Sequence, residues 1–287
     1  MHNTDLTDES WVQLRDQESK LSIQIDSTGI AYSVLNIREN KFVRFKYITI
    51  ENDFLSDDKY YDKLATVLRE EESLKKSFNS VHFLFMSARY TLIPFPLFEQ
   101  SKAEVLYKFN HQSEASEKIR INKLKNTEAW LIFSMPETFV NMVESSFPKA
   151  GLIHKTAVFI ENLMLSGNYD KFNNEPAVFV DVNHGNFDIA VIDHSKLKLS
   201  NNFIFQNEQD FCYFIMYVFD QLKLNPEEAY VMLSGDTGTG SKEYFILKKY
   251  IRNVSFAGRS AYFNYSNCFD LLPQHKFLNL LNIHRCE

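Results

Sequence analysis

The chain has 287 residues, of which 45% are hydrophobic and 24% are charged, and its formal net charge at pH 7 is −6. This balance is that of a folded globular protein and excludes a largely disordered chain. The acidic net charge argues against a general nucleic-acid binder, whose affinity depends on neutralising phosphates.

Residues 1–20 are polar and acidic and have no hydrophobic period, which predicts a flexible N-terminal arm. Turn residues then separate β-rich runs, which predicts hairpin-linked strands. A helix is expected over 57–78, and the near-continuous apolar run 81–86 predicts a strand buried on both faces. The three hairpin-linked strands are 21–26, 31–37 and 42–50.

A small inserted module is expected at about 99–148, inside a first domain that extends over 21–165. Its clearest strand is 128–134, and Pro136 is well placed to open the helix 137–147. The basic stretch 118–125 is interpreted as a solvated strand or loop face, because it is short and isolated in an acidic chain. It gives no strong nucleic-acid signal.

The order of the opening elements recurs in a second domain, 177–287. Strands at 177–182, 187–192 and 197–205 precede a helix at 208–222 and a buried strand at 229–234. A duplicated β-β-β-α-β order is stronger evidence than any single motif, since few topologies are allowed. The sequence therefore predicts an α/β protein of two related domains flanking a cleft.

Three cysteines occur, at 212, 268 and 286, without metal-ligand spacing and with one left over from any pairing. The first residues lack the basic start and apolar stretch of a signal peptide. No apolar run approaches the ~18 residues that a membrane span needs. A cytoplasmic protein without a membrane span is expected.

Each domain opens with a hairpin that carries an aspartate and a glycine. The first hairpin holds Asp26, Ser27, Thr28 and Gly29, and the second runs from Asp181 to Gly185. Each aspartate has a purely structural alternative to a functional role: it could cap its own turn by accepting hydrogen bonds from nearby backbone N–H groups. A third loop, 235–240, follows the buried strand of the second domain, and Ser241 could cap the next helix.

This element order and these three loops resemble the actin-like ATPase superfamily of actin, Hsp70 chaperones and sugar kinases, whose domains have a ribonuclease H-like fold. More narrowly, the chain looks like the actin-like proteins of bacterial pilus assembly, and like an uncharacterised bacterial family with that fold. The resemblance covers residues 21–258. It implies ATP and Mg²⁺ as ligands, with Asp26 and Asp181 holding Mg²⁺ through water. It assigns phosphate and nucleotide contacts to Asp26, Ser27, Thr28, Gly29, Asp181, Asn183, Gly185, Gly235, Asp236 and Gly238.

Several positions depart from that family pattern. The first turn is one residue too long, and Asn183 stands where glycine is expected, although asparagine tolerates left-handed geometry. Asp236 replaces a second glycine, and a carboxylate beside a phosphate is electrostatically unfavourable. No cation follows Gly29 before Arg38, and Glu161 is the one residue that we can assign to orienting a catalytic water.

We therefore expect a degenerate ATPase-fold scaffold that binds protein partners and keeps a vestigial or regulatory nucleotide cleft. One alternative is an active ATPase or small-molecule kinase with divergent phosphate loops. Another is a pure interaction module without a nucleotide site, which docks partners through residues 99–148. The sequence predicts no oligomeric state.

Overall fold

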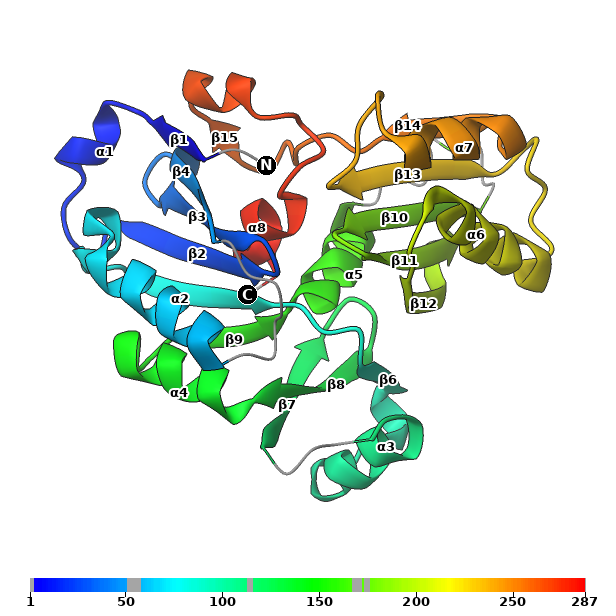
Figure 1. Ribbon diagram of the computed structural model, residues 1–287, viewed down its shortest axis with the longest axis horizontal. Coiled ribbons are helices and arrows are strands. Elements are labelled where there is room, and N and C mark those ends of the chain that lie inside the picture. Colours follow the sequence, from blue (N-terminus) through cyan, green and yellow to red (C-terminus); the bar gives the residue numbers. More distant parts are fainter. Residues whose placement is uncertain (1–2, 51–57, 113–115, 167–171, 173–175, 287) are drawn as a thin grey trace.

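The computed structural model describes residues 3–50, 58–112, 116–166, 172 and 176–286. Two α/β bodies lie side by side, and a small module projects from the first (Figure 1). We call the body built on the seven-stranded sheet the first domain and the body built on the five-stranded sheet the second domain. The predicted α/β architecture of two related halves is confirmed.

The first domain begins its sheet with two tight antiparallel hairpins, as the turn residues predicted. The strand order is β1-β4-β3-β2-β5-β9, with β15 also paired to β4. The elements are β2 Ser19–Asp26, β3 Gly29–Asn36, β4 Lys41–Thr49, α2 Asp58–Glu70, β5 Ser80–Phe85, α4 Glu137–Ser146 and β9 Gly151–His154. The predicted helix 57–78 is shorter than expected: α2 ends at Glu70 and a 3-10 turn follows at Glu72–Lys75, while residue 57 lies outside the described residues.

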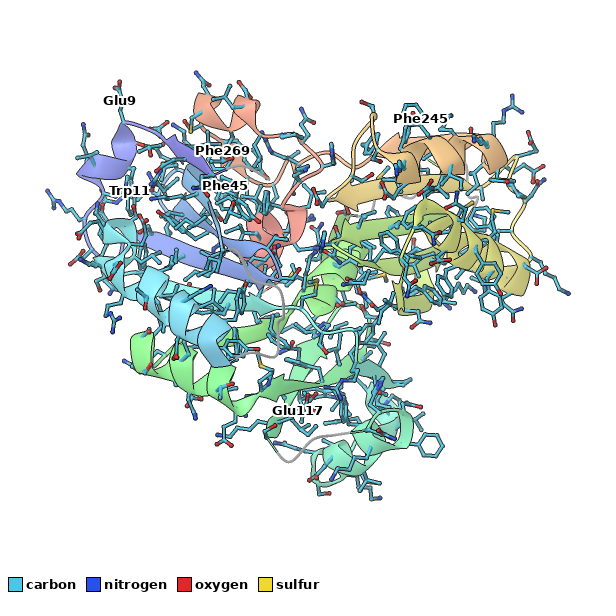
Figure 2. The ribbon with its side chains drawn as sticks, in the orientation of Figure 1. Glu9, Trp11, Phe45, Glu117, Phe245 and Phe269 are labelled. Atoms are coloured by element: carbon cyan, nitrogen blue, oxygen red, sulfur yellow. The ribbon has the colours of Figure 1, made fainter. Side chains whose placement is uncertain are left out.

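Both faces of this first sheet are buried. Leu21 and Ile23 of β2 belong to the core under α2 and α4, and Phe42 and Phe45 of β4 belong to a core on the opposite face. Phe45 packs against Phe269, with ring centroids 6.3 Å apart (Figure 2). Successive side chains of a strand point to opposite faces of the sheet, so a strand that is buried on both faces needs apolar residues at odd and at even positions.

The second domain repeats the first, with strand order β12-β11-β10-β13-β14. The helices α6 and α7 cover one face of this sheet, and α5, Lys155–Ser166, connects the two domains. In both domains the predicted β-β-β-α-β unit is followed by one more helix and strand. The elements are β10 Ala177–Asn183, β11 Asn186–Asp193, β12 Lys196–Ile204, α6 Glu208–Leu222, β13 Tyr230–Gly235, α7 Lys242–Tyr250 and β14 Asn253–Phe256.

The inserted module starts earlier and ends earlier than expected. It consists of the three-stranded sheet β6-β8-β7 and the helix α3, over residues 90–136. The helix α4 instead packs against α2 and occupies in the first domain the place of α7 in the second. The module elements are β6 Tyr90–Pro94, α3 Ala103–Asn110, β7 Glu117–Leu124 and β8 Ala129–Pro136.

The end of the chain returns to the first domain, so the expected second domain of 177–287 is too long. The strand β15, Asn264–Tyr265, pairs with β4. The helix α8, Leu278–Asn282, and Phe269 bury apolar side chains against the first sheet. Elements of two and five residues carry too little periodicity to be assigned from sequence.

The prediction of a flexible N-terminal arm is wrong for the described residues. The strand β1, Thr4–Thr7, pairs antiparallel with β4, and the helix α1, Ser10–Gln13, follows it. Trp11 is only 7% exposed and stacks on Phe78 (Figure 2). One buried aromatic anchor and a four-residue strand therefore hold a segment whose composition suggested disorder.

The three cysteines form no disulfide. Among the helices of the described residues, none has the length and apolar character that crossing a bilayer requires.

Candidate functional site

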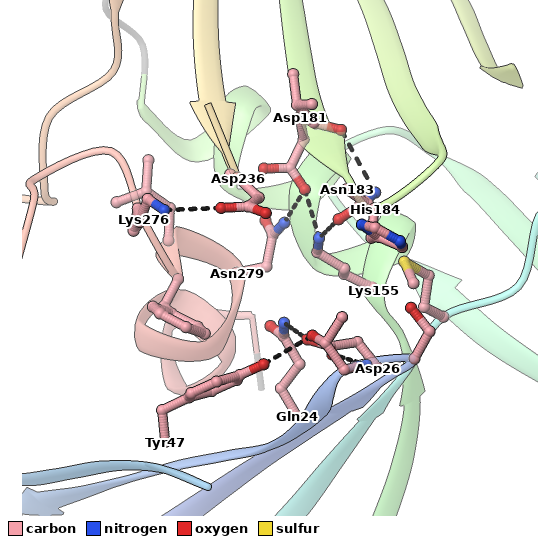
Figure 3. A pocket seen from close by; sticks show the side chains of 17 residues that line it. Gln24, Asp26, Tyr47, Lys155, Asp181, Asn183, His184, Asp236, Lys276 and Asn279 are labelled. Carbon is pink, nitrogen blue, oxygen red and sulfur yellow. Dashed lines mark hydrogen bonds and ion pairs between the residues drawn. The ribbon is translucent and has the colours of Figure 1, made fainter. Parts of the chain in front are cut away.

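A pocket of about 220 Å³ lies between the two domains, where the hairpins β2–β3 and β10–β11 face each other (Figure 3). The helix α8 and the segment before it close one side. The lining residues are Gln24, Asp26, Ser27, Thr28, Tyr47, Met86, Lys155, Asp181, Val182, Asn183, His184, Gly235, Asp236, Lys276, Phe277, Leu278 and Asn279.

The pocket brings together most, but not all, of the residues expected at a nucleotide cleft. Asp26, Ser27, Thr28, Asp181, Asn183, Gly235 and Asp236 line it. Gly29, Gly185 and Gly238 do not. Ser241 caps α7 by accepting a hydrogen bond from the backbone N–H of Tyr244, as the sequence predicted.

Asp181 is the most completely bonded carboxylate of the pocket and is only 2% exposed. Its Oδ1 accepts a hydrogen bond from Ser234 Oγ at 2.7 Å, and its Oδ2 accepts one from Asn279 Nδ2 at 2.9 Å. Lys155 Nζ lies 2.7 Å from the same Oδ2. Both oxygens therefore have partners within the protein.

Lys155 is a buried ammonium that the sequence analysis did not identify. It is the first residue of α5, is 5% exposed, and also donates to Asn183 Oδ1. Burial disfavours its charge, but the carboxylates of Asp181 and Asp188 outweigh that effect and raise the pKa of Lys155. The one available clue was the polar run His154-Lys155-Thr156, which interrupts an otherwise apolar stretch over 152–160.

The two hairpins have the same turn length, which reveals an offset between their aspartates. Asp26 pairs with Gly29 across the turn Ser27–Thr28, and Asn183 pairs with Asn186 across the turn His184–Gly185. Counted back from the turns, Asp26 corresponds to Asn183, and the equivalent of Asp181 is Gln24. Asp26 and Asp181, which the family resemblance assigned together to Mg²⁺, are therefore not equivalent positions of the two hairpins but lie two residues apart in register.

Asp26 acts as the cap of its own turn. Its Oδ1 accepts hydrogen bonds from the backbone N–H of Thr28 at 2.9 Å and from Thr28 Oγ1 at 2.6 Å. Gln24 Nε2 lies 3.4 Å from Asp26 Oδ2. Tyr47 hydrogen-bonds Thr28 Oγ1 at 2.7 Å and thereby fixes the turn from the neighbouring strand.

The third loop is tied to other backbone groups. The Gly235 N–H donates to His275 O, and the Asp236 N–H donates to Val182 O at 2.7 Å. A Cβ on Gly235, which has φ +84°, would lie 2.1 Å from Val182 O, so only glycine fits this close crossing. Lys276 Nζ pairs with Asp236 Oδ1 at 2.7 Å. The backbone N–H groups of Gly235 and Asp236 therefore take part in folding and are not directed at a ligand.

A second buried carboxylate, Asp188, lies behind Lys155. Asp188 Oδ1 accepts from Thr156 Oγ1 at 2.8 Å and from Asn202 Nδ2 at 3.1 Å. Burial raises the pKa of Asp188 to about 6, although Lys155 acts to lower it. The start of α5 is thus held to the second domain by a buried polar network.

Glu161 does not lie at the pocket, and the expected water-orienting role has no geometric support. Its carboxylate accepts hydrogen bonds from the backbone N–H groups of Asn126 and Thr127, each at 3.1 Å, and from both of their side chains. It therefore fixes the turn between β7 and β8 of the inserted module. Such a saturated carboxylate is a structural residue of the turn.

The residues of this pocket do not fit the Mg²⁺ and ATP that the fold resemblance implied. Mg²⁺ needs carboxylate oxygens free to bind its water shell, and Asp181 has already given both of its oxygens to Lys155, Asn279 and Ser234. The volume of about 220 Å³ is also below the ~300–1,000 Å³ usual for ligand pockets. Within the described ranges no group of three or more His, Cys, Asp or Glu side chains could hold a metal ion.

Comparisons with solved structures identify the fold. A Bacteroides thetaiotaomicron protein with actin-like ATPase fold and unknown function superposes with a TM-score of 0.80 and 23% identity, covering 95% of this chain and 97% of that one. The PilM–PilN type IV pilus biogenesis complex matches with a TM-score of 0.59, 10% identity, and 93% and 98% coverage. The ethanolamine utilization protein EutJ from Carboxydothermus hydrogenoformans matches with a TM-score of 0.50 and 11% identity, covering 98% of this chain and 96% of that one.

No curated protein matches this chain in sequence. One family model does, and it covers residues 9–254, from the start of α1 to β14. The chain has an actin-like ATPase fold and belongs to the family described as protein of unknown function (DUF3822).

Proposed function

We propose that this protein is a non-catalytic actin-like scaffold that binds protein partners, with a cleft that no longer performs phosphoryl transfer. The observation that carries the proposal is the buried ion pair between Lys155 and Asp181, whose charged atoms lie 2.7 Å apart. Phosphoryl transfer depends on cations and Mg²⁺ placed around the phosphates. Here the buried cation of the cleft is part of the protein and neutralises the carboxylate that a metal would need.

The inserted module supports partner binding. Val105 and Phe109 lie one helical turn apart on α3 and are 69% and 88% exposed, and Leu97 nearby in sequence is 70% exposed. The inner side of the same helix buries Ala103 and Tyr107 in the module core. Exposed apolar side chains on one helix face are typical of interaction surfaces. A similar fold occurs in PilM, which is seen in complex with PilN.

The first test is nucleotide binding and turnover. Isothermal titration calorimetry with ATP and Mg²⁺, followed by a phosphate-release assay, should detect no turnover. ATP hydrolysis by the wild type that is lost in Asp181→Ala would overturn the proposal and favour an active ATPase. Tight binding without hydrolysis would assign the cleft a regulatory role within the scaffold.

The second test addresses the module. Cross-linking in the source cells, followed by mass spectrometry, should recover a partner that depends on Val105 and Phe109. The double variant Val105→Asp, Phe109→Asp should lose that partner, whereas Tyr213→Asp, on the exposed face of α6, should keep it. A partner retained by the double variant would remove the module from the proposal.

A further inference from the structure

The first-hairpin side of the pocket presents hydrogen-bond acceptors that the protein leaves unsatisfied. Gln24 is only 7% exposed, and its buried Oε1 has no hydrogen-bond partner among the residues that the structure describes. A buried polar atom without a partner is costly, about 1–3 kcal/mol. Gln24 lines the pocket beside Asp26 (Figure 3), so a donor group of a ligand could complete this site.

The charge of the pocket favours a cation at that point. Three carboxylates line it, those of Asp26, Asp181 and Asp236. Lys155 pairs with Asp181 and Lys276 pairs with Asp236. Within the described part of the chain, Asp26 is the pocket carboxylate that has no ion-pair partner. Lys155 also interacts with Asp26 through space, but the three carboxylates still outnumber the two ammonium groups of the pocket by one. This excess of negative charge favours a positive group over a phosphate at Asp26.

The geometry at Asp26 suits a donor with more than one N–H. Asp26 Oδ1 is occupied by Thr28, whereas for Oδ2 the described ranges of the chain offer only the 3.4 Å contact with Gln24 Nε2. That contact places the open carboxylate oxygen next to the glutamine whose Oε1 is unsatisfied. A guanidinium or an ammonium group carries several donors and makes strong charge-assisted bonds with such an arrangement.

One part of the remaining wall is apolar and aromatic, although polar residues such as Asn183 and Asn279 also line the pocket. The rings of Tyr47 and Phe277 lie 5.8 Å apart, and Met86 and Leu278 also line the pocket. Aromatic faces attract organic cations through their quadrupole, and apolar walls accept the carbon chain that carries the charge. The volume of about 220 Å³ limits the occupant to a group smaller than a nucleoside triphosphate.

We propose that the cleft pocket binds an organic cation bearing a guanidinium or primary ammonium group, whose donors bond Asp26 and Gln24 and whose carbon chain lies against Tyr47 and Phe277. The occupant is either a free small molecule or an arginine or lysine side chain of a protein partner, since the recognising chemistry is the same. This site is independent of the scaffold proposal, because cation binding requires neither hydrolysis nor its absence.

The test is calorimetric titration of the full chain with two probes, agmatine and the blocked peptide acetyl-Gly-Arg-Gly-amide. The wild type should bind at least one probe, and Asp26→Asn should weaken that binding at least tenfold, because it removes the charge but keeps the shape. Gln24→Met should weaken it to a smaller extent. The control Asp220→Asn removes an exposed carboxylate from α6, outside the pocket, and should leave the affinity unchanged.

The two probes separate the sources of the cation. Binding of agmatine alone supports a free small molecule, and binding of the peptide supports a partner side chain. No heat signal with either probe at 10 mM would overturn the proposal, as would equal affinities of wild type and Asp26→Asn. Thermal unfolding of each variant should show that it is folded, so a lost signal reports the site. ATP turnover, the test of the scaffold proposal, is measured separately and can fail or succeed without changing this result.

Discussion

The two hairpins at the cleft have the same turn length and strand register, but their polar side chains are paired differently. In the second hairpin, Asp181 and its neighbour on the same face, Asn183, both bond the single buried ammonium of Lys155. Their equivalents in the first hairpin, Gln24 and Asp26, contact each other at 3.4 Å, and neither bonds a lysine in the part of the chain that the structure describes. Duplication has preserved the turn and the strand register while the charges were redistributed. We call the second-hairpin side of the cleft locked, because Lys155 pairs with its carboxylate within the protein. We call the first-hairpin side open, because Asp26 has no ion-pair partner among the described residues.

The largest expected effect on stability comes from removing the Lys155 ammonium, which locks the second-hairpin side. Lys155→Met leaves the carboxylates of Asp181 and Asp188 buried without a cation, so the free energy of unfolding should fall by about 3–5 kcal/mol. Urea unfolding followed by circular dichroism measures it. Lys102→Met, which breaks an exposed pair with Glu99, should change stability by less than about 1 kcal/mol. Equal losses in the two variants would show that the buried pair is not a lock.

The hairpin glycines give a matched pair of substitutions. A Cβ on Gly29 would lie 2.1 Å from Ile48 O on the neighbouring strand, whereas a Cβ on Gly185 would meet nothing within 4 Å. Gly29→Ala should destabilise by about 3 kcal/mol, at the upper end of overpacking effects. Gly185→Ala, at φ +77°, should lose only about 1–2 kcal/mol from left-handed strain. Denaturant unfolding of both variants tests the difference, and the reverse order would contradict the register described above.

The buried Asp188 should make the locked side sensitive to pH. Because its pKa of about 6 in the folded protein is above the unfolded value, the folded state binds the proton more tightly. The stabilisation from Asp188 is complete below the unfolded pKa and is lost as pH rises through about 6. Relative to Asp188→Asn, the wild type should therefore lose about 2 kcal/mol between about pH 4.5 and 7.5.

That measurement needs the variant as its reference, because another buried group acts in the opposite direction. Burial lowers the pKa of His154 to about 3, so its contribution is present above the unfolded pKa and is lost as pH falls. His154 is present in both proteins, and its effect cancels in the difference. Urea midpoints at the two pH values give the result, with Asp220→Asn as a control that should follow the wild type. A pH-independent difference between wild type and Asp188→Asn would contradict the prediction.

The smallest effect on stability is expected on the open side. Asp26→Asn keeps an oxygen that can accept from the Thr28 N–H, and asparagine caps turns about as well as aspartate, so unfolding should change by less than about 1 kcal/mol. Urea unfolding at pH 7 checks this value. A larger loss would mean that the charge of Asp26 is used within the fold, which would make the two hairpins alike.

Most of the fold was predictable because it depends on local patterns. Alternating and continuous apolar runs, separated by turn residues, identified the strands of both hairpins, and repetition identified the duplication. The family resemblance then supplied the actin-like architecture, which the comparisons confirm. The short elements at both ends, β1 and α8, were not predicted, because they are held by tertiary contacts of single side chains such as Trp11.

The part of the candidate site that could be predicted lies in the strand ends and turns of the two hairpins. Asp26 and Asp181 were found, but counting from each aspartate, instead of from each turn, hid the equivalence of Gln24 and Asp181. Lys155 comes from a different element, 26 residues before Asp181 in the chain. Its pairing depends on how α5 meets the second sheet, and no short-range pattern carries that information.

The return of the C-terminal segment to the first sheet has a mechanical consequence. The chain passes between the domains twice, after α5 and again between β14 and β15. Two covalent connections limit the relative motion of two domains more than one connection does. Asn279, on α8 after the second crossing, hydrogen-bonds the carboxylate that pairs with Lys155, at the start of α5 before the first crossing. Any rotation that widens the cleft must therefore pull Asp181 away from at least one of them.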